Sequence, residues 1–192
     1  RKLQQMQVSN GGWCWFEGGP DDRYMTQYII QGMGQLDHLG IKSVRDDRRT
    51  WNMVTNAVQY LDHRIREDYE WILKYDKPNM AKDHLSSIAI QYLYARSFFK
   101  DVNMTAKDKE AFDYFFGQEK KYWTTQSRYM QGMIALAQFR YDVKGITAND
   151  VMKSLKETSL TSDEMGMYWK ENTAGYYWYQ APIETQSLLI EP

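Results

Sequence analysis

The sequence predicts an all-α fold of helical hairpins arranged in two layers, with little or no sheet. Apolar residues recur at three- and four-residue steps through most of the chain, which is the spacing of amphipathic helices. No segment alternates convincingly with a period of two, and no Asn-Gly or Asp-Gly turn joins two β-branched runs. The tripeptide Gln-Gly-Met at residues 31–33 recurs at residues 131–133. Together these observations favour a repetitive helical protein.

Short signals mark the ends of several expected helices. Asp21 or Asp22 is the N-cap of the first helix, and Gly40 stops it. Capping-box-like sequences mark two later starts, Thr105-x-x-Asp108 and Thr147-x-x-Asp150. We expect helices over residues 21–39, 50–75, 82–99, 106–116, 124–141 and 148–158, and the beginning of another at 183–191. Residues 1–8 read as the last turns of a preceding helix. The apolar face of the first complete helix contains Tyr24, Met25, Tyr28, Ile29, Gly32, Met33, Leu36 and Leu39.

The repeat predicts that inner and outer helices alternate. The two Gln-Gly-Met segments lie 100 positions apart, which fits two helical hairpins of about 50 residues each. Gly32, Ala89 and Gly132 lie in mid-helix, where small residues let neighbouring helices approach closely. Helix starts that alternate with more charged helices lie near Asp22, Asp83, Thr124 and Pro182. We therefore expect about four hairpins in a single domain over residues 1–192.

Two aromatic loops lead into similar helical segments. The first loop contains Gly11, Gly12, Trp13 and Trp15, and the second contains Tyr177 and Trp178. The first precedes Thr26-Gln27 and the second precedes Thr185-Gln186. Because the arrangement is used twice before equivalent helices, we interpret both loops as staples between hairpins and not as a ligand platform.

Composition limits the classes of partner. The 192 residues, of which 43% are hydrophobic, suffice for one domain with a sizeable core. Twenty-four basic residues against 25 acidic ones, without a basic stripe, argue against nucleic acid. No apolar stretch approaches the ~18 residues that a membrane-spanning helix needs, so we expect no direct membrane insertion by this segment. A single cysteine excludes an intrachain disulfide.

The loop motifs carry a family resemblance. Gln7-x-x-x-Gly11-x-Trp13 matches the glutamine-tryptophan motif of terpenoid cyclases, in which the loop staples successive hairpins of an α/α toroid. A longer pattern joins the first loop to Gly18-Gly19-Pro20-Asp21-Asp22, Gly166-Met167-Tyr168-Trp169, Gly175-Tyr176-Tyr177-Trp178 and Ile183-Glu184-Thr185-Gln186. This joint pattern resembles the thioester-type toroid domain of bacterial alpha-2-macroglobulin-like proteins, particularly the large Bacteroides-type forms.

The resemblance implies a non-catalytic domain of a broad-range protease inhibitor. In that family a protease cuts a bait region, the protein changes conformation, and the protease is enclosed or held through a thioester. The chain would then be an incomplete toroid, about two-thirds of a full one. Its partners would be target proteases and the other domains of the same long polypeptide, in the periplasm or cell envelope. The Cys-x-Glu-Gln thioester motif is not in this chain, whose only cysteine begins Cys14-Trp15-Phe16-Glu17.

The chemical candidates are few. We expect Cys14 to pack in the interior, since no histidine or helix start adjoins it to activate the thiol. Each histidine follows an aspartate, and such a dipeptide does not form a chelate on a helix, so we expect neither a metal nor a cofactor. The alternative function is an α/α-toroid carbohydrate-active enzyme with Glu17 and Asp22 as acid and base. A cap at the start of a helix is the competing role for Asp22.

Overall fold

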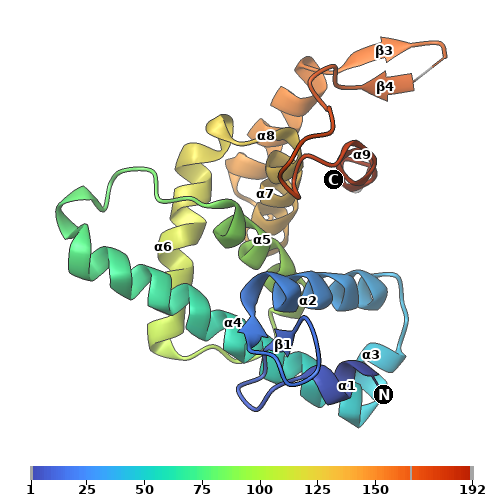
Figure 1. The fold of residues 1–192 in the computed structure, drawn as a ribbon. Coiled ribbons are helices and arrows are strands. Elements are labelled where there is room, and N and C mark those ends of the chain that lie inside the picture. Colours follow the sequence, from blue (N-terminus) through green and yellow to red (C-terminus); the bar gives the residue numbers. More distant parts are fainter. Residues whose placement is uncertain (1, 165, 191–192) are drawn as a thin grey trace.

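The computed structural model describes residues 2–164 and 166–190 and confirms the all-α prediction (Figure 1). About 65% of the chain is helical, and the described residues add only two small antiparallel sheets. The elements are α1 (Lys2–Met6), β1 (Trp13–Cys14), β2 (Asp21–Asp22), α2 (Arg23–His38), α3 (Ser43–Asp46), α4 (Arg48–Tyr75), η1 (Lys77–Asn79), α5 (Ser87–Arg96), η2 (Ser97–Phe99), α6 (Ala106–Tyr122), η3 (Trp123–Thr125), α7 (Arg128–Tyr141), α8 (Ile146–Glu157), β3 (Leu160–Ser162), β4 (Gly166–Tyr168) and α9 (Pro182–Leu188).

The helices form two rows. In one row α2 packs against α5, α5 against α7, and α7 against α9. The helices between them in sequence, α4, α6 and α8, pack on the outside of this row, through the pairs α2 with α4, α5 with α6, and α7 with α8. Inner and outer helices therefore alternate along the chain, as expected from the repeat. Closure of the rows into a toroid stays a prediction.

Side-chain caps fix most helix starts. The Asp22 carboxylate accepts a hydrogen bond from the Met25 amide at 2.7 Å, so Asp22 is the N-cap of α2. Asp47, Ser86, Thr105 and Ser127 cap α4, α5, α6 and α7 in the same way. The expected starts at residues 82 and 124 were wrong, because the capping hydroxyls lie later in the chain.

Three further boundaries differ from expectation. Helix α8 begins at Ile146 with Gly145 as N-cap, so the predicted cap at Thr147 was wrong, and Thr147 is buried inside the helix. Helix α6 continues to Tyr122, well past the expected end at residue 116. Helix α9 ends at Leu188, and Glu191 lies outside the described residues, as does Arg1 of the expected first helix.

Helix α2 buries a different face from its apolar one. The exposed fractions of Tyr28 and Leu39 are 60% and 75%, whereas Gln27 is completely buried. The Gln27 amide donates to Gln91 Oε1 at 2.9 Å and to the Ile88 carbonyl at 3.1 Å, both on α5. Polar bonds between α2 and α5 therefore turn the polar side of α2 inward. The buried residues of α2 are Thr26, Gln27, Ile30, Gln31 and Gly34.

Two glycines permit close approaches between elements, although not the pair expected. A Cβ atom at Gly132 would lie 2.9 Å from the Leu189 side chain, so Gly132 lets the end of α9 approach α7. A Cβ atom at Gly34 would lie 2.4 Å from the Phe98 ring. Gly32 faces open space, and its expected role as a close-packing position was wrong.

Candidate functional site

The first aromatic loop joins three helices. The Gln7 side-chain amide donates to the Gly11 carbonyl and to the Met53 carbonyl of α4, each at 2.9 Å. The Trp13 indole donates to the Leu3 carbonyl of α1 at 2.7 Å. The Trp13 backbone amide donates to the Thr26 hydroxyl of α2 at 2.8 Å. The loop thus has the geometry of a staple across α1, α2 and α4.

Gly11 and Gly12 allow the loop to lie directly against its neighbours. Gly11 has a φ of +95°, and a Cβ atom there would lie 2.4 Å from the Asn56 carbonyl oxygen of α4. A Cβ atom at Gly12 would lie 2.9 Å from the Asp21 side chain and 3.0 Å from the Tyr60 ring. Position 11 therefore requires glycine for two reasons: its backbone has a positive φ, and a side chain there would collide with the backbone of α4.

Trp15 does not share the role of Trp13. Trp13 is 1% exposed, whereas Trp15 is 57% exposed at the tip of the loop. Strands β1 and β2 pair Trp13 with Asp22, which returns the chain to the start of α2 beneath this tip. Of the three aromatic residues in the loop, Trp13 is therefore a buried anchor, whereas Trp15 and Phe16 are exposed.

The second aromatic loop is built differently from the first. Tyr177 is 55% exposed, and its ring stacks on Tyr179 with the centroids 5.3 Å apart. Trp178 packs against Tyr24 of α2 and Tyr129 of α7, with the ring centroids 5.2 and 6.0 Å away. Trp178 therefore bridges two inner helices by aromatic contact and does not occupy the position equivalent to Trp13.

Trp169 occupies that equivalent position. Its side chain is 4% exposed, and its indole donates to the Leu155 carbonyl of α8 at 2.9 Å. Leu155 belongs to the outer helix that precedes Trp169, just as Leu3 belongs to the helix that precedes Trp13. Both anchors therefore tie the loop after one helix to a backbone carbonyl of that helix.

The inner helices that follow the two anchors also begin alike. The Thr26 hydroxyl donates to the Asp22 carbonyl at 2.7 Å, and the Thr185 hydroxyl donates to the Ala181 carbonyl at 2.8 Å. Both threonines are buried. Sequence reasoning matched the Thr-Gln pairs correctly but paired the wrong tryptophans. The short strands beside Trp13 and Trp169 are seen only in the structure, so no sequence signal distinguished Trp169 from Trp178.

Comparison with known protein families and with curated proteins finds no match to this chain. The family resemblance of the loop motifs therefore stays a proposal. None of the helices in the described part of the chain combines the length and the apolar character needed to cross a membrane.

The two candidate carboxylates of an enzyme do not share a cavity. Asp22 lines a cavity of about 580 Å³ together with Asp68, Trp71 and His84. The Asp22 carboxylate is engaged as the cap of α2, and Asp68 pairs with Arg23 at 2.5 Å. Glu17 is exposed in the first loop and is not among the residues that line this cavity. The geometry therefore favours the capping role for Asp22.

Cys14 and His84 are held by hydrogen bonds to neighbouring elements. Cys14 is 2% exposed, and its thiol donates to the Met6 carbonyl at 3.3 Å. His84 contacts Asp76 through Nε2 at 3.0 Å and the Tyr114 hydroxyl through Nδ1 at 2.5 Å. Within residues 2–164 and 166–190, no group of three or more His, Cys, Asp and Glu side chains could hold a metal ion.

Buried charges lie behind the inner row, where sequence reasoning had not placed them. Asp62 of α4 accepts from Arg96 Nε at 2.9 Å and from the Tyr92 hydroxyl at 2.7 Å. Burial raises the pKa of Asp62 to about 6, although Arg96 and Tyr92 act in the opposite direction. Glu119 of α6 is fully buried beside Gln138, and burial raises the pKa of its carboxyl well above the ordinary value. These groups bind helices together and face no cavity described above.

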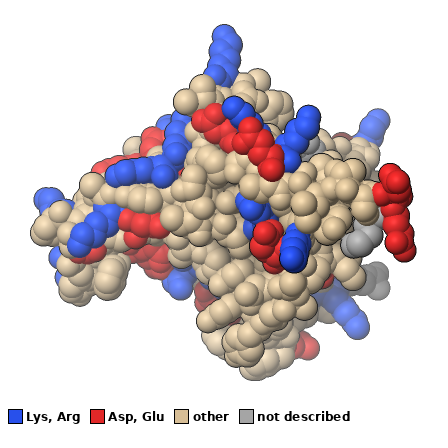
Figure 2. Space-filling view, turned by 90° about the horizontal axis from the view of Figure 1, so that it is seen from above, with Lys and Arg blue, Asp and Glu red and all other residues tan. Residues whose placement is uncertain are grey.

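The surface carries charges of both signs. Figure 2 shows Lys and Arg side chains interspersed with Asp and Glu over the face seen from above. Oppositely charged side chains of the chain also form ion pairs, among them Lys109 with Asp113 and Lys120 with Asp142. This distribution agrees with the net charge of -1.

Proposed function

We propose that this chain is a non-catalytic, helical-repeat domain of a bacterial alpha-2-macroglobulin-like protease inhibitor that acts in the periplasm or cell envelope. The observation that carries the proposal is the staple at Trp13. The residues on which the resemblance rests, Gln7, Gly11 and Trp13, are the ones whose hydrogen bonds and close contacts join α1, α2 and α4.

The alternation of inner and outer helices supports the same proposal. Trp13 and Trp169 lie in the loops that lead into the inner helices α2 and α9, and each indole is bonded to a carbonyl of the helix before its loop. In the proposed role the domain is a rigid body of the trap, and its partners are the other domains of the polypeptide and the captured protease. We propose no thioester chemistry in this chain, because its single cysteine is buried and no Cys-x-Glu-Gln sequence is present.

The test uses the full-length polypeptide that the proposal requires. It is incubated with limiting trypsin, chymotrypsin or elastase, and the mixture is separated by size-exclusion chromatography. We expect each active protease to co-elute with the cleaved polypeptide. Protease inactivated beforehand with an active-site inhibitor is the control and should elute alone. Cleavage without retention of any protease would contradict the proposal.

The second candidate is a carbohydrate-active enzyme, and one observation favours it. The cavity beside Asp22 and Asp68 carries the exposed side chain of Trp71, and a sugar ring stacks well on such an aromatic surface. This candidate predicts hydrolysis of at least one polysaccharide in a panel, and loss of that activity in Asp22→Asn. If the folded protein cleaves none of the panel, the enzyme candidate fails.

A further inference from the structure

A buried carboxyl and a buried amide meet between α6 and α7. Glu119 of α6 is 0% exposed, and Gln138 of α7 is 1% exposed. Gln138 Nε2 donates to Glu119 Oε2 at 2.8 Å and to the Phe116 carbonyl of α6 at 3.2 Å. Because both partners are oxygens, these two bonds fix the nitrogen of the amide against α6 and leave its oxygen beside them.

Each of the two side chains has one oxygen left over. Glu119 Oε1 and Gln138 Oε1 are both buried, and neither has a hydrogen-bond partner among the described residues. Two oxygens do not attract each other without a proton between them, and a buried acceptor without a donor is unfavourable. A neutral carboxyl supplies the missing donor, since its O–H donates while its other oxygen accepts. A proton on Glu119 Oε1 therefore satisfies both oxygens at once, and the acid and the amide form a ring of two hydrogen bonds.

The charged groups around Glu119 do not favour its ionised form. Burial raises the pKa of Glu119, and the hydrogen bond from Gln138 acts in the opposite direction. Of the helices packed against α6, α5 carries the buried cation Arg96, which pairs with Asp62 of α4 at 2.9 Å. The titratable group of α7 that interacts with Glu119 is Tyr141, whose hydroxyl donates to the Arg96 carbonyl at 3.2 Å. In the part of the chain that the structure describes, no cation pairs with Glu119.

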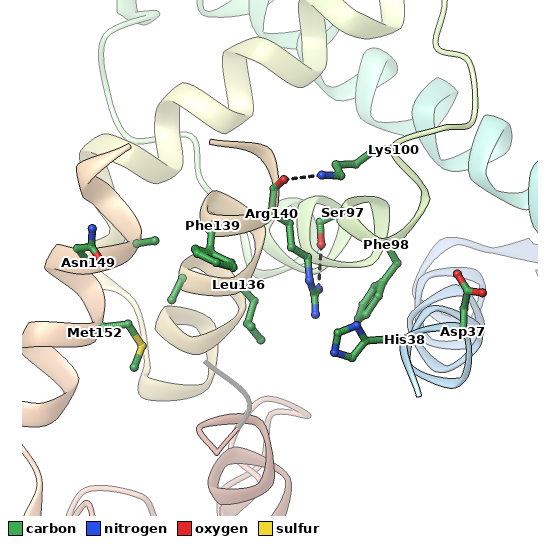
Figure 3. A pocket seen from close by; sticks show the side chains of 12 residues that line it. Asp37, His38, Ser97, Phe98, Lys100, Leu136, Phe139, Arg140, Asn149 and Met152 are labelled. Atoms are coloured by element: carbon green, nitrogen blue, oxygen red, sulfur yellow. Dashed lines mark hydrogen bonds between the residues drawn. The ribbon is translucent and has the colours of Figure 1, made fainter. Parts of the chain in front are cut away.

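Other bonds of α7 do not depend on this proton. Lys100 Nζ donates to the Arg140 carbonyl at 2.6 Å, and Arg140 Nη1 donates to the Ser97 hydroxyl at 3.0 Å. These bonds lie beside a cavity of about 500 Å³ and tie the end of α7 to η2 and the residue after it (Figure 3). Lys120 of α6 pairs with Asp142 after α7, but their side chains are 42% and 38% exposed, and such a pair contributes little.

We propose that Glu119 and Gln138 form a proton-dependent latch between α6 and α7, which is closed while the carboxyl is neutral and opens when its proton is lost to solvent. In the closed latch Glu119 Oε1–H donates to Gln138 Oε1, and Glu119 Oε2 accepts from Gln138 Nε2. Without the proton, a carboxylate oxygen faces the amide oxygen away from water, so the carboxylate is more stable exposed. The last turns of α6, residues 116–122, then separate from α7. This inference is independent of the proposed function, because it concerns the packing of two helices and no partner.

Hydrogen exchange, measured by mass spectrometry as a function of pH, tests the latch on the purified chain. The opened state carries a carboxyl with the ordinary glutamate pKa of ~4.3, so opening releases one proton above that pH. The equilibrium constant for opening should therefore rise ~10-fold for each pH unit between that value and the pKa of the buried carboxyl. After correction for the intrinsic pH dependence of exchange, peptides from residues 116–122 should show this slope and exchange faster than peptides from α2. If peptides from both regions exchange at the same rate with the same slope, Glu119 ionises only on global unfolding and the latch is overturned.

Three variants separate the latch from ordinary packing. Glu119→Gln puts an N–H in place of the O–H and keeps both bonds of the ring at every pH, so it should abolish the slope in residues 116–122. Gln138→Met removes the amide and should raise opening at acidic pH by ~10-fold, the factor that the loss of a buried hydrogen bond provides. Asp142→Asn removes an exposed carboxylate at the same joint. It is the matched control and should leave the slope unchanged. A slope that survives Glu119→Gln would overturn the proposal.

Infrared spectra detect the proton directly. At mildly acidic pH, where exposed carboxyls are already ionised, the difference between the unchanged chain and Glu119→Gln should contain the carbonyl band of a neutral carboxylic acid. Gln138→Met should keep this band and shift it to higher frequency, because Glu119 Oε2 then has no donor. If Glu119→Gln does not fold, ¹³C labelling of the glutamate carboxyls identifies the band in the unchanged chain alone. A carboxylate band in its place would show that Glu119 is ionised in the closed state, which would overturn the latch.

Discussion

Alanine at Gly11 is the sharpest perturbation of the loop staple. Gly11 has a φ of +95°, and an alanine held in such a left-handed conformation costs ~1–2 kcal/mol. The new Cβ atom would also lie 2.4 Å from the Asn56 carbonyl oxygen and 2.8 Å from its carbon. Backbone atoms of α4 cannot rotate away, so the loop must lift from the helix, at a further cost of ~1–3 kcal/mol. The expected total loss in the free energy of unfolding is about 2–5 kcal/mol.

Gly18→Ala is the matched control for this experiment. Gly18 also has a positive φ, +78°, but a Cβ atom there meets nothing within 4 Å. It should therefore lose only the conformational part, ~1–2 kcal/mol. Urea unfolding followed by circular dichroism measures both variants against the unchanged chain. Equal losses for the two glycines would refute the idea that contact with α4 is what requires glycine at Gly11.

Three further sets of variants test the tryptophan anchors, the buried ion pair and the buried carboxyl of Glu119. Trp13→Phe and Trp169→Phe should each lower the free energy of unfolding by ~1–3 kcal/mol, because each leaves a leucine carbonyl without its indole donor. Trp15→Phe, at an exposed position, should change that free energy by no more than ~0.5 kcal/mol. A larger effect of Trp15→Phe would show that exposure does not distinguish Trp15 from the two anchors. Arg96→Met should lower the free energy of unfolding by ~3–5 kcal/mol, because it leaves the Asp62 charge buried and unpaired. The double variant Arg96→Met, Asp62→Leu should recover part of that loss in the same urea assay. No recovery would contradict the idea that the unpaired Asp62 charge causes the loss. Burial raises the pKa of Glu119, so its carboxyl keeps a proton in the folded state at a pH where the unfolded chain has lost it. The free energy of unfolding should therefore fall as the pH rises above the ordinary glutamate pKa of ~4.3. Glu119→Gln should flatten that fall in thermal melts taken between acidic and neutral pH, and an unchanged slope would contradict a neutral Glu119.

The parts of the fold that were predictable depend on neighbours in the chain. The N-cap of α2 at Asp22 and the start of α6 at Thr105 are local hydrogen bonds between residues three positions apart, and their residue types signal them directly. The period of the hydrophobic pattern likewise identified the long α4 to within two residues of its observed start. Local signals of this kind need no knowledge of what packs against the helix.

The parts that were not predictable depend on distant partners. The buried face of α2 is set by Gln27, whose amide reaches Gln91 of α5, and glutamine gives no sign in the sequence that it will be buried. The anchor at Trp169 depends on the Leu155 carbonyl of α8, which lies 14 residues earlier in the chain. The dense aromatic cluster around Trp178 instead predicted that tryptophan as the equivalent of Trp13, although Trp178 packs against Tyr24. The cavity lined by Arg140 brings together four elements that no motif connects.

The proposed role of this chain in a protease trap is tested most directly by a ratio of two protease activities. Full-length polypeptide is mixed with trypsin, and the remaining activity is measured on a small chromogenic peptide and on casein. An enclosed protease still reaches the small substrate but not the large protein. If the protease is enclosed, the ratio of peptide activity to casein activity should rise strongly once the polypeptide has been cleaved. An unchanged ratio after complete cleavage would contradict the proposed role.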